Sequence, residues 1–188
     1  GKNMKVIDCF NIFLFEDTVP IKIDILKIIS KQKNRRFASN RKGIQYNVNL
    51  KDFKELTTAV EKHFSFFKEK LSIQDKHNFI FNSMWLNVNP PLSYNIPHVH
   101  PNCILSGVYY FKVPLNSGNL VLKHPSQSRA FDDYNYKVYN CFNSALYSIA
   151  PIENKLYIFS NDLEHYVEPN CSNDTRISVS FNLIISKD

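Results

Sequence analysis

The sequence predicts a mainly β domain, a sandwich or barrel, with N-terminal helices packed on one sheet. Before residue 78, apolar residues recur at helical spacing, and from Asn78 onward they alternate with polar residues over many short segments separated by turns. Helices followed by a run of strands are typical of helices that cover one face of an antiparallel sheet. The 188 residues are enough for a sizeable core, and we expect one domain over residues 1–188.

The N-terminal part, residues 1–77, is expected to supply an opening strand and supporting helices. Met4–Phe15 is predicted to be a strand or strand pair. An amphipathic helix should follow Pro20, because four isoleucines recur at helical spacing and proline suits the first turn. Residues 34–49 are polar and basic, as in a loop. A second helix is predicted over Leu50–Leu71, with Asn49 as its cap. The residues of its apolar stripe are Phe53, Leu56, Val60, Phe64, Phe67 and Leu71.

Seven strands are predicted in the remaining part, residues 78–188. They span Phe79–Val88, Ile104–Val113, Asn119–Lys123, Ala145–Ile149, Lys155–Phe159, His165–Glu168 and Arg176–Ile185. The long polar connection Ser126–Asn143 lies among them, and long loops in compact domains are often functional. Its tyrosines, Tyr134, Tyr136 and Tyr139, could flank a substrate or simply pack under the loop.

Composition restricts the class of protein. The formal charge of +6 is compatible with acidic small molecules or nucleic acid and establishes neither. Six basic residues lie between Lys31 and Lys42, which indicates a solvated loop or a patch that faces substrate. The four cysteines are scattered without CxxC spacing, so we expect reduced thiols. There is no signal peptide and no apolar run of about 18 residues, so we expect a cytoplasmic protein without a membrane partner.

Two histidines two residues apart, His98 and His100, are the most informative feature of the sequence. In an extended strand such residues point to the same side, so both imidazoles can bind one metal ion. A third histidine, His165, lies on a later predicted strand that a barrel can bring to the same point. Three neutral imidazoles can hold a divalent first-row metal. The alternative is that His98 and His100 share a strand by chance and bind no metal. His63 and His124 are expected to be packing or surface residues.

A strand with one polar and one apolar face begins at Arg176. Its polar face consists of Arg176, Ser178, Ser180 and Asn182. Such a face either meets solvent or lines a polar cavity. A guanidinium can clamp a carboxylate with two parallel hydrogen bonds, and the Ser178 hydroxyl can add a third donor. The sequence therefore indicates an acidic co-substrate beside a metal, with an ordinary surface arginine as the alternative.

These motifs resemble the iron(II)- and 2-oxoglutarate-dependent oxygenases, and within them the small oxygenases of phage and marine bacteria related to prolyl hydroxylases. The resemblance covers about Met84 to Ile185. Its elements are Trp85-Leu86-Asn87-Val88, Pro97-His98-Val99-His100-Pro101, Leu105-Ser106-Gly107-Val108-Tyr109-Tyr110, Leu156-Tyr157-Ile158-Phe159, His165-Tyr166-Val167-Glu168-Pro169 and Arg176-Ile177-Ser178-Val179-Ser180-Phe181-Asn182. The resemblance implies a double-stranded β-helix, a jelly-roll or cupin-like barrel of two four-stranded sheets.

The resemblance also implies a metal site. His98, His100 and His165 would be the catalytic iron(II) ligands. His100 stands where most of the superfamily has a carboxylate, so iron affinity and redox behaviour should shift. A different metal, or an indirect carboxylate ligand such as Glu164 or Asp162, is the alternative.

The co-substrate pocket is implied in the same way. Arg176, Ser178 and Tyr110 would bind the distal carboxylate of 2-oxoglutarate. Trp85 and Asn87 would line the pocket. For Tyr110, a purely structural role as a core aromatic stays open.

The activity implied is that of a dioxygenase. It would hydroxylate an unidentified small-molecule or peptidyl substrate with O2, giving succinate and CO2. We expect no nucleic-acid partner, and a homodimer formed through the helices or an edge strand stays open. A cupin-like three-histidine metalloenzyme that does not use 2-oxoglutarate and a non-catalytic binding domain are the two alternatives.

Overall fold

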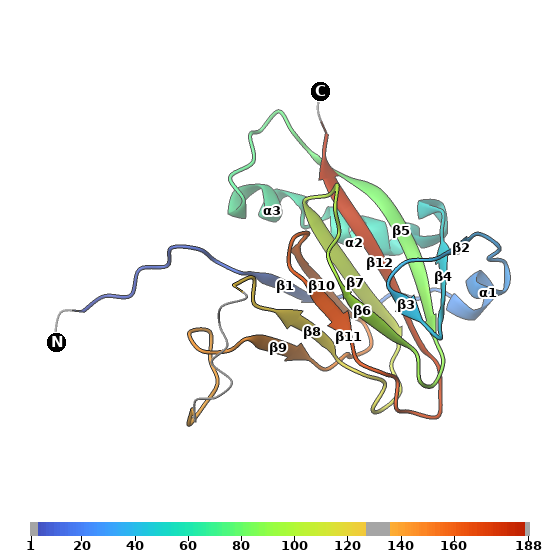
Figure 1. The fold of residues 1–188 in the computed structure, drawn as a ribbon. Helices are drawn as coiled ribbons and strands as arrows, with labels where there is room; N and C mark the ends of the chain where they lie inside the picture. The colour runs from blue at the N-terminus through green and yellow to red at the C-terminus, as the bar shows by residue number, and fades with distance from the viewer. Residues whose placement is uncertain (1–3, 127–135, 187–188) are drawn as a thin grey trace.

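The structure, a computed structural model, describes residues 4–126 and 136–186 and consists of two antiparallel sheets with helices on one side (Figure 1). The larger sheet has the strand order β1-β10-β7-β12-β5-β4-β2, and the smaller sheet has the order β3-β6-β11-β8-β9. This is the predicted jelly-roll arrangement, with more strands in each sheet than the four that the resemblance implied. No helix in the described ranges is long and apolar enough to cross a membrane.

The strands of the larger sheet are β1 (Leu14–Thr18), β2 (Arg35–Arg36), β4 (Ile44–Asn47), β5 (Phe79–Asn89), β7 (Leu105–Lys112), β10 (Lys155–Ser160) and β12 (Arg176–Ile185). The strands of the smaller sheet are β3 (Asn40–Arg41), β6 (Tyr94–His98), β8 (Leu120–Lys123), β9 (Leu146–Ile149) and β11 (His165–Val167). All seven strands predicted after residue 78 are present. The additional strand, β6, is not among the seven predicted strands and lies in a stretch rich in proline and asparagine.

The helices cover the outer face of the larger sheet, as predicted (Figure 1). They are α1 (Ile25–Ser30), the 3-10 helix η1 (Leu50–Phe53), α2 (Lys54–Glu61) and α3 (Phe64–Lys70). Their buried side chains, Phe53, Leu56, Val60 and Phe67, share one core cluster with the apolar face of the sheet. The sheet contributes Leu86, Tyr109, Ile158, Val179, Phe181 and Leu183, among others. One face of the larger sheet is thus fixed by helix packing.

Several N-terminal predictions are wrong in their boundaries. Residues 4–13 form no strand, and β1 begins only at Leu14. The first helix begins at Ile25, where Asp24 caps it by accepting from the Lys27 amide at 3.0 Å. The second helix is three segments, with a break at Lys62 and His63.

The predicted loop over residues 34–49 instead forms three short strands. β2 and β4 pair with each other, and β4 extends the larger sheet beyond β5. β3 pairs with β6 at the edge of the smaller sheet. The segment therefore joins both sheets at one side of the barrel, so residues 1–77 contribute to the barrel as well as to its helical cover.

The inner face of the larger sheet is polar along β12 and β5. Along β12, Ile177, Val179 and Phe181 face the helices, and Arg176, Ser178 and Ser180 face the cavity between the sheets. The same alternation holds on β5. There, Trp85, Asn87 and Asn89 line the cavity. The polar face predicted for the last strand thus lines a cavity and does not meet solvent.

Candidate active site

The structure brings His98, His100 and His165 together at one end of the cavity. One ring nitrogen from each lies within 4.8 Å of the others. His98 ends β6 and pairs directly with His165 at the start of β11, while His100 follows two residues after His98. The His100 Nε2 and His165 Nε2 atoms are 3.1 Å apart. The sequence pattern therefore predicted the juxtaposition of all three residues.

The three imidazoles present the same nitrogen to the centre. Each Nδ1 atom faces an oxygen. The His98 Nδ1 lies 2.7 Å from Ile96 O, the His100 Nδ1 lies 3.0 Å from Asn182 Oδ1, and the His165 Nδ1 lies 2.8 Å from Leu163 O. Nδ1 must carry the proton to make these bonds, so each Nε2 offers a lone pair. Two facing lone pairs 3.1 Å apart repel unless a cation lies between them. The donor set therefore fits a metal ion.

Burial keeps the three rings neutral. Desolvation, followed by the charge of His98, lowers the pKa of His165 to about 3 and that of His100 to about 4. Desolvation also lowers the pKa of His98. A neutral imidazole is the form that binds metal, so the cluster is ready to do so at neutral pH.

No carboxylate belongs to this group among the described residues. Glu164 forms an ion pair with Lys123, and Asp162 accepts a hydrogen bond from Ser160. The described residues that line the cavity include no aspartate or glutamate. The carboxylates considered as indirect ligands are thus engaged elsewhere.

Arg176 lies in the same cavity and is 3% exposed. Its Nη1 donates to the Ser117 and Gly118 carbonyls at 2.6 and 3.0 Å. Its Nε is buried without a hydrogen-bond partner, and within residues 4–126 and 136–186 it forms no ion pair. A buried guanidinium without a counter-charge is costly, so this geometry fits an anionic ligand.

Two further donors lie next to Arg176 in the sheet. Ser178 is paired in register with Tyr110 of β7, and both line the cavity. Burial raises the pKa of Tyr110 to about 12, so its phenol stays protonated and able to donate. Ser178 accepts from Asn87 Nδ2 at 3.2 Å, which leaves its own hydroxyl proton free to donate. The structure thus brings the predicted co-substrate residues together.

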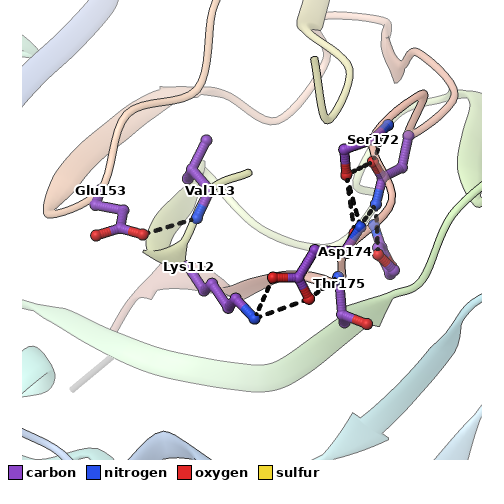
Figure 2. A network of polar contacts seen from close by, with 8 residues as sticks. Lys112, Val113, Glu153, Ser172, Asp174 and Thr175 are labelled. Atoms are coloured by element: carbon purple, nitrogen blue, oxygen red, sulfur yellow. Dashed lines mark hydrogen bonds and ion pairs between the residues drawn. The ribbon is translucent and has the colours of Figure 1, made fainter. Parts of the chain in front are cut away.

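The loop before β12 fixes the start of Arg176's strand (Figure 2). Lys112 at the end of β7 forms an ion pair with Asp174 at 2.7 Å, and Asp174 also accepts from the Thr175 amide at 2.6 Å. Asn170, fully buried, donates to the Asn89 and Asp174 carbonyls. These contacts tie the loop to β5 and β7 and so set where Arg176 enters the cavity.

Gly118, whose carbonyl accepts from Arg176, lies against the backbone of Glu168 and Pro169. Its φ is +88°, and a Cβ there would lie 2.2 Å from the Glu168 carbonyl oxygen. Glycine alone adopts this backbone without strain. Its carbonyl therefore reaches the Arg176 guanidinium.

Some site residues carry no signal in the sequence. Asn182 fixes the His100 ring and also accepts from Ser106 at 2.9 Å. Ser39 Oγ lies 3.3 Å from His98 Nε2, and Arg36 stacks on Trp85. Sequence alternation placed Asn182 on the correct face. A patch that faces substrate is one of the two interpretations of the basic residues between Lys31 and Lys42, but no pattern identifies Arg36 or Ser39 as the residues that reach the site.

Other predicted roles can be located as well. His63 bonds Asp17 at 2.8 Å and His124 accepts from the Ser126 amide, so neither joins the cluster, as expected. Tyr136 and Tyr139 pack against each other at 5.8 Å between ring centroids, and Tyr134 lies outside the described residues.

Residues 83–182 match the family model described as "Putative 2OG-Fe(II) oxygenase". No curated protein matches the chain. The fold is similar to solved structures of low sequence identity. A prolyl-4-hydroxylase from Pseudomonas putida is 12% identical, with 91% of this chain and 92% of that chain covered and a TM-score of 0.61.

Two further structures share the fold. A prolyl hydroxylase from Trichoplax adhaerens, in complex with a hypoxia inducible factor peptide fragment, is 14% identical, covers 91% and 83% of the two chains and has a TM-score of 0.63. HygX from Streptomyces hygroscopicus, with nickel and 2-oxoglutarate bound, is 7% identical, covers 92% and 82% and has a TM-score of 0.61. The family match spans more than half of the chain and includes all six predicted site residues. The chain therefore belongs to the iron(II)- and 2-oxoglutarate-dependent oxygenases, whose cofactors are iron(II) and 2-oxoglutarate.

Proposed function

We propose that this oxygenase hydroxylates a substrate with O2 and releases succinate and CO2, and that six residues form its working site. His98, His100 and His165 bind iron(II) through Nε2. Arg176, Ser178 and Tyr110 bind the distal carboxylate of 2-oxoglutarate.

The burial of the Arg176 guanidinium without a counter-charge among the described residues is the main observation that supports this proposal. The guanidinium is buried, bonded to two backbone carbonyls and left with an unpaired Nε that faces no carboxylate of the described chain. A small dicarboxylate supplies the missing acceptor. Ser178 and Tyr110 add neutral donors to the same group, as the shared register of β12 and β7 allows. A three-histidine metalloenzyme without 2-oxoglutarate would leave this arginine without a counter-charge.

The three neutral histidines carry no negative charge to the metal. Iron(II) therefore keeps its full charge of +2 in this ligand set, and the dianionic co-substrate provides the neutralisation that a carboxylate ligand gives elsewhere. We expect iron to bind more weakly alone than with 2-oxoglutarate. The relation is reciprocal, because each ligand then raises the affinity of the other by the same factor.

The protein's own contribution is positioning. Asn182 and the Ile96 and Leu163 carbonyls fix the ring orientations, and Trp85 stacks on His100 at 5.4 Å between ring centroids. His100 and His165 are buried within the barrel. When bound, iron(II) with 2-oxoglutarate and O2 supplies the oxidation of a substrate C–H bond to an alcohol.

The experiment is an anaerobic titration with iron(II) and 2-oxoglutarate, followed by the visible absorption band that 2-oxoglutarate gives when bound to iron(II). We expect the band in the wild type and in Arg35→Met, which removes an exposed arginine. His165→Ala should lose iron and Arg176→Met should lose the band while keeping iron.

A wild type that binds iron without the band would favour the three-histidine alternative. Absence of metal binding would favour a non-catalytic domain. The homodimer, the cytoplasmic location and the single-domain organisation remain predictions, and light scattering checks the first of them.

A further inference from the structure

Arg36 is a cation beside the active site that the proposed function does not use. Its guanidinium carbon lies 4.3 Å from the centre of the Trp85 ring. Its Nε is buried and has no hydrogen-bond partner. Within the part of the chain that the structure describes, Arg36 forms no ion pair. A half-buried arginine that is stacked but unpaired has its donors available for an added ligand.

Arg36 differs from the other basic residues of its segment. Lys31, Lys33, Arg35, Arg41 and Lys42 are exposed. Arg36 alternates with Arg35 on β2 and so points to the opposite face. Of the two interpretations of this basic segment, a solvated loop fits most of these charges, whereas Arg36 is stacked on Trp85, which lines the cavity.

The position of Arg36 places a ligand next to the histidines. In register it lies opposite Gln45, whose side chain lines the cavity and whose buried Oε1 has no partner. Trp85, which Arg36 covers, also stacks on His100.

The charges of the cavity leave room for a second anion. The described lining has no acidic side chain, and the nearby Glu164 is paired with Lys123. Iron(II) and Arg176 together carry three positive charges, and 2-oxoglutarate returns two negative ones. Arg36, stacked on Trp85 beside His100, then remains without a counter-charge among the described residues. A negatively charged group on the primary substrate would supply it.

We propose that Arg36, stacked on Trp85, anchors the primary substrate by binding an oxyanion on it, so that the substrate is a small acid carrying a carboxylate or phosphate. Gln45 Oε1 can accept an N–H or O–H from the same molecule. The assignment of this anion as the substrate rests on the proposed function. The binding of an anion by Arg36 does not, and it can be measured without metal or co-substrate.

The chain offers a direct probe, because Trp85 is its one tryptophan. We would titrate the metal-free protein with acetate, inorganic phosphate and, as a neutral isostere, acetamide at constant ionic strength, and follow tryptophan fluorescence. At least one anion should give a saturable change and acetamide none. Which of the two anions binds tells a carboxylate from a phosphate substrate.

Four variants locate the site. Arg36→Met should weaken anion binding about tenfold or more, the cost of a lost charged hydrogen bond, and Arg36→Lys should restore part of it. Arg35→Met, on the same strand but exposed, should stay within about twofold of the wild type. Arg176→Met should also retain the signal. Circular dichroism spectra equal to the wild type confirm that Arg36→Met is folded.

Three results would overturn the proposal. They are a wild type that gives no saturable change with either anion, a signal that survives in Arg36→Met, and a signal that disappears in Arg176→Met. Failure of the proposed function would be seen separately, as a missing iron–2-oxoglutarate band. If that band is present in both the wild type and Arg36→Met, small acids should stimulate succinate release where their amides do not. Equal stimulation by the amides would also count against Arg36 as the anchor.

Discussion

Asn182 shows how one residue outside the metal ligand set can control the site. Its Oδ1 accepts from His100 Nδ1 at 3.0 Å and from Ser106 Oγ at 2.9 Å. Both bonds require the amide oxygen to face the ring, which fixes the tautomer that leaves Nε2 free. The orientation of the neutral His100 ring therefore depends on this bond and on its stacking against Trp85.

Replacing Asn182 with alanine should weaken metal binding without unfolding the barrel. Loss of a partner that orients a histidine ligand costs about 10–100-fold in metal affinity. Nickel(II) titration calorimetry on Asn182→Ala measures it. Asn119→Ala serves as the control, because Asn119 donates to Ser148 away from the cluster. Equal nickel affinity in Asn182→Ala and the wild type would show that Asn182 does not orient His100 for metal binding.

Tyr110 and Tyr109 form a matched pair on β7, since adjacent strand residues face opposite sides. Tyr110 lines the cavity, whereas the Tyr109 hydroxyl donates to Val19 O at 2.7 Å in the helical layer. Tyr110→Phe should weaken 2-oxoglutarate binding about tenfold, because it removes a neutral donor to a carboxylate. Iron affinity alone should not change.

Tyr109→Phe is the control for that experiment. It should lower the free energy of unfolding and leave the 2-oxoglutarate dissociation constant as it is. A Tyr110→Phe protein that binds 2-oxoglutarate as tightly as the wild type would assign Tyr110 to the core alone, the structural role that the sequence left open.

The histidines and Arg176 could be predicted from the sequence because their chemistry shows in residue type and strand spacing. Arg36 and Ser39 could not. Arg36 lies on β2 and Ser39 lies directly before β3, and each of these strands has only two residues. A two-residue strand has no periodicity to detect, and its pairing depends on β4 and β6 already being in place.

Among the secondary-structure elements, the long paired strands could also be predicted from the sequence, whereas the N-terminal segment could not. β5 and β12, with eleven and ten residues, form a long antiparallel pair whose alternation is visible in the sequence. The stretch Met4–Phe15 was wrongly predicted as a strand because its residues are apolar. In the structure Met4, Ile7 and Phe10 are exposed and only the end of the stretch pairs with β10. Apolar composition alone does not supply a partner strand.

Gly107 provides a test of how β7 and β12 pack. A Cβ at this position would lie 2.3 Å from Phe181 Cζ, and the two residues face each other in register. Gly107→Ala should therefore destabilise the protein by about 1–3 kcal/mol, the usual cost of overpacking a core. Urea unfolding measures the difference.

The double variant Gly107→Ala, Phe181→Leu checks the cause. If the clash with the Phe181 ring is responsible, the double variant should lose less stability than the sum of the two single variants. Strict additivity, or a Gly107→Ala protein as stable as the wild type, would show that the strands adjust without strain.

At the scale of the whole molecule, the histidine cluster couples stability to pH. In the folded metal-free protein the pKa of His165 is about 3 and that of His100 about 4, because both are buried. In the unfolded chain both return to about 6.5. Between these values the unfolded state binds more protons than the folded state, so stability falls as the pH falls. Above about pH 7 both states are neutral at these positions and the cluster adds no pH dependence.

The metal-free protein should therefore lose about 2 kcal/mol per buried histidine between pH 7 and pH 5, as two pKa shifts of this size require. Urea unfolding of the wild type and of His165→Gln at both pH values measures this loss. The variant should lose about 2 kcal/mol less than the wild type over the same interval, whatever its stability at pH 7. Equal losses would mean that His165 is not held neutral by the fold. Saturating nickel(II) should stabilise the wild type at pH 7 and do so less at pH 5, because protons and metal compete for the same Nε2 atoms.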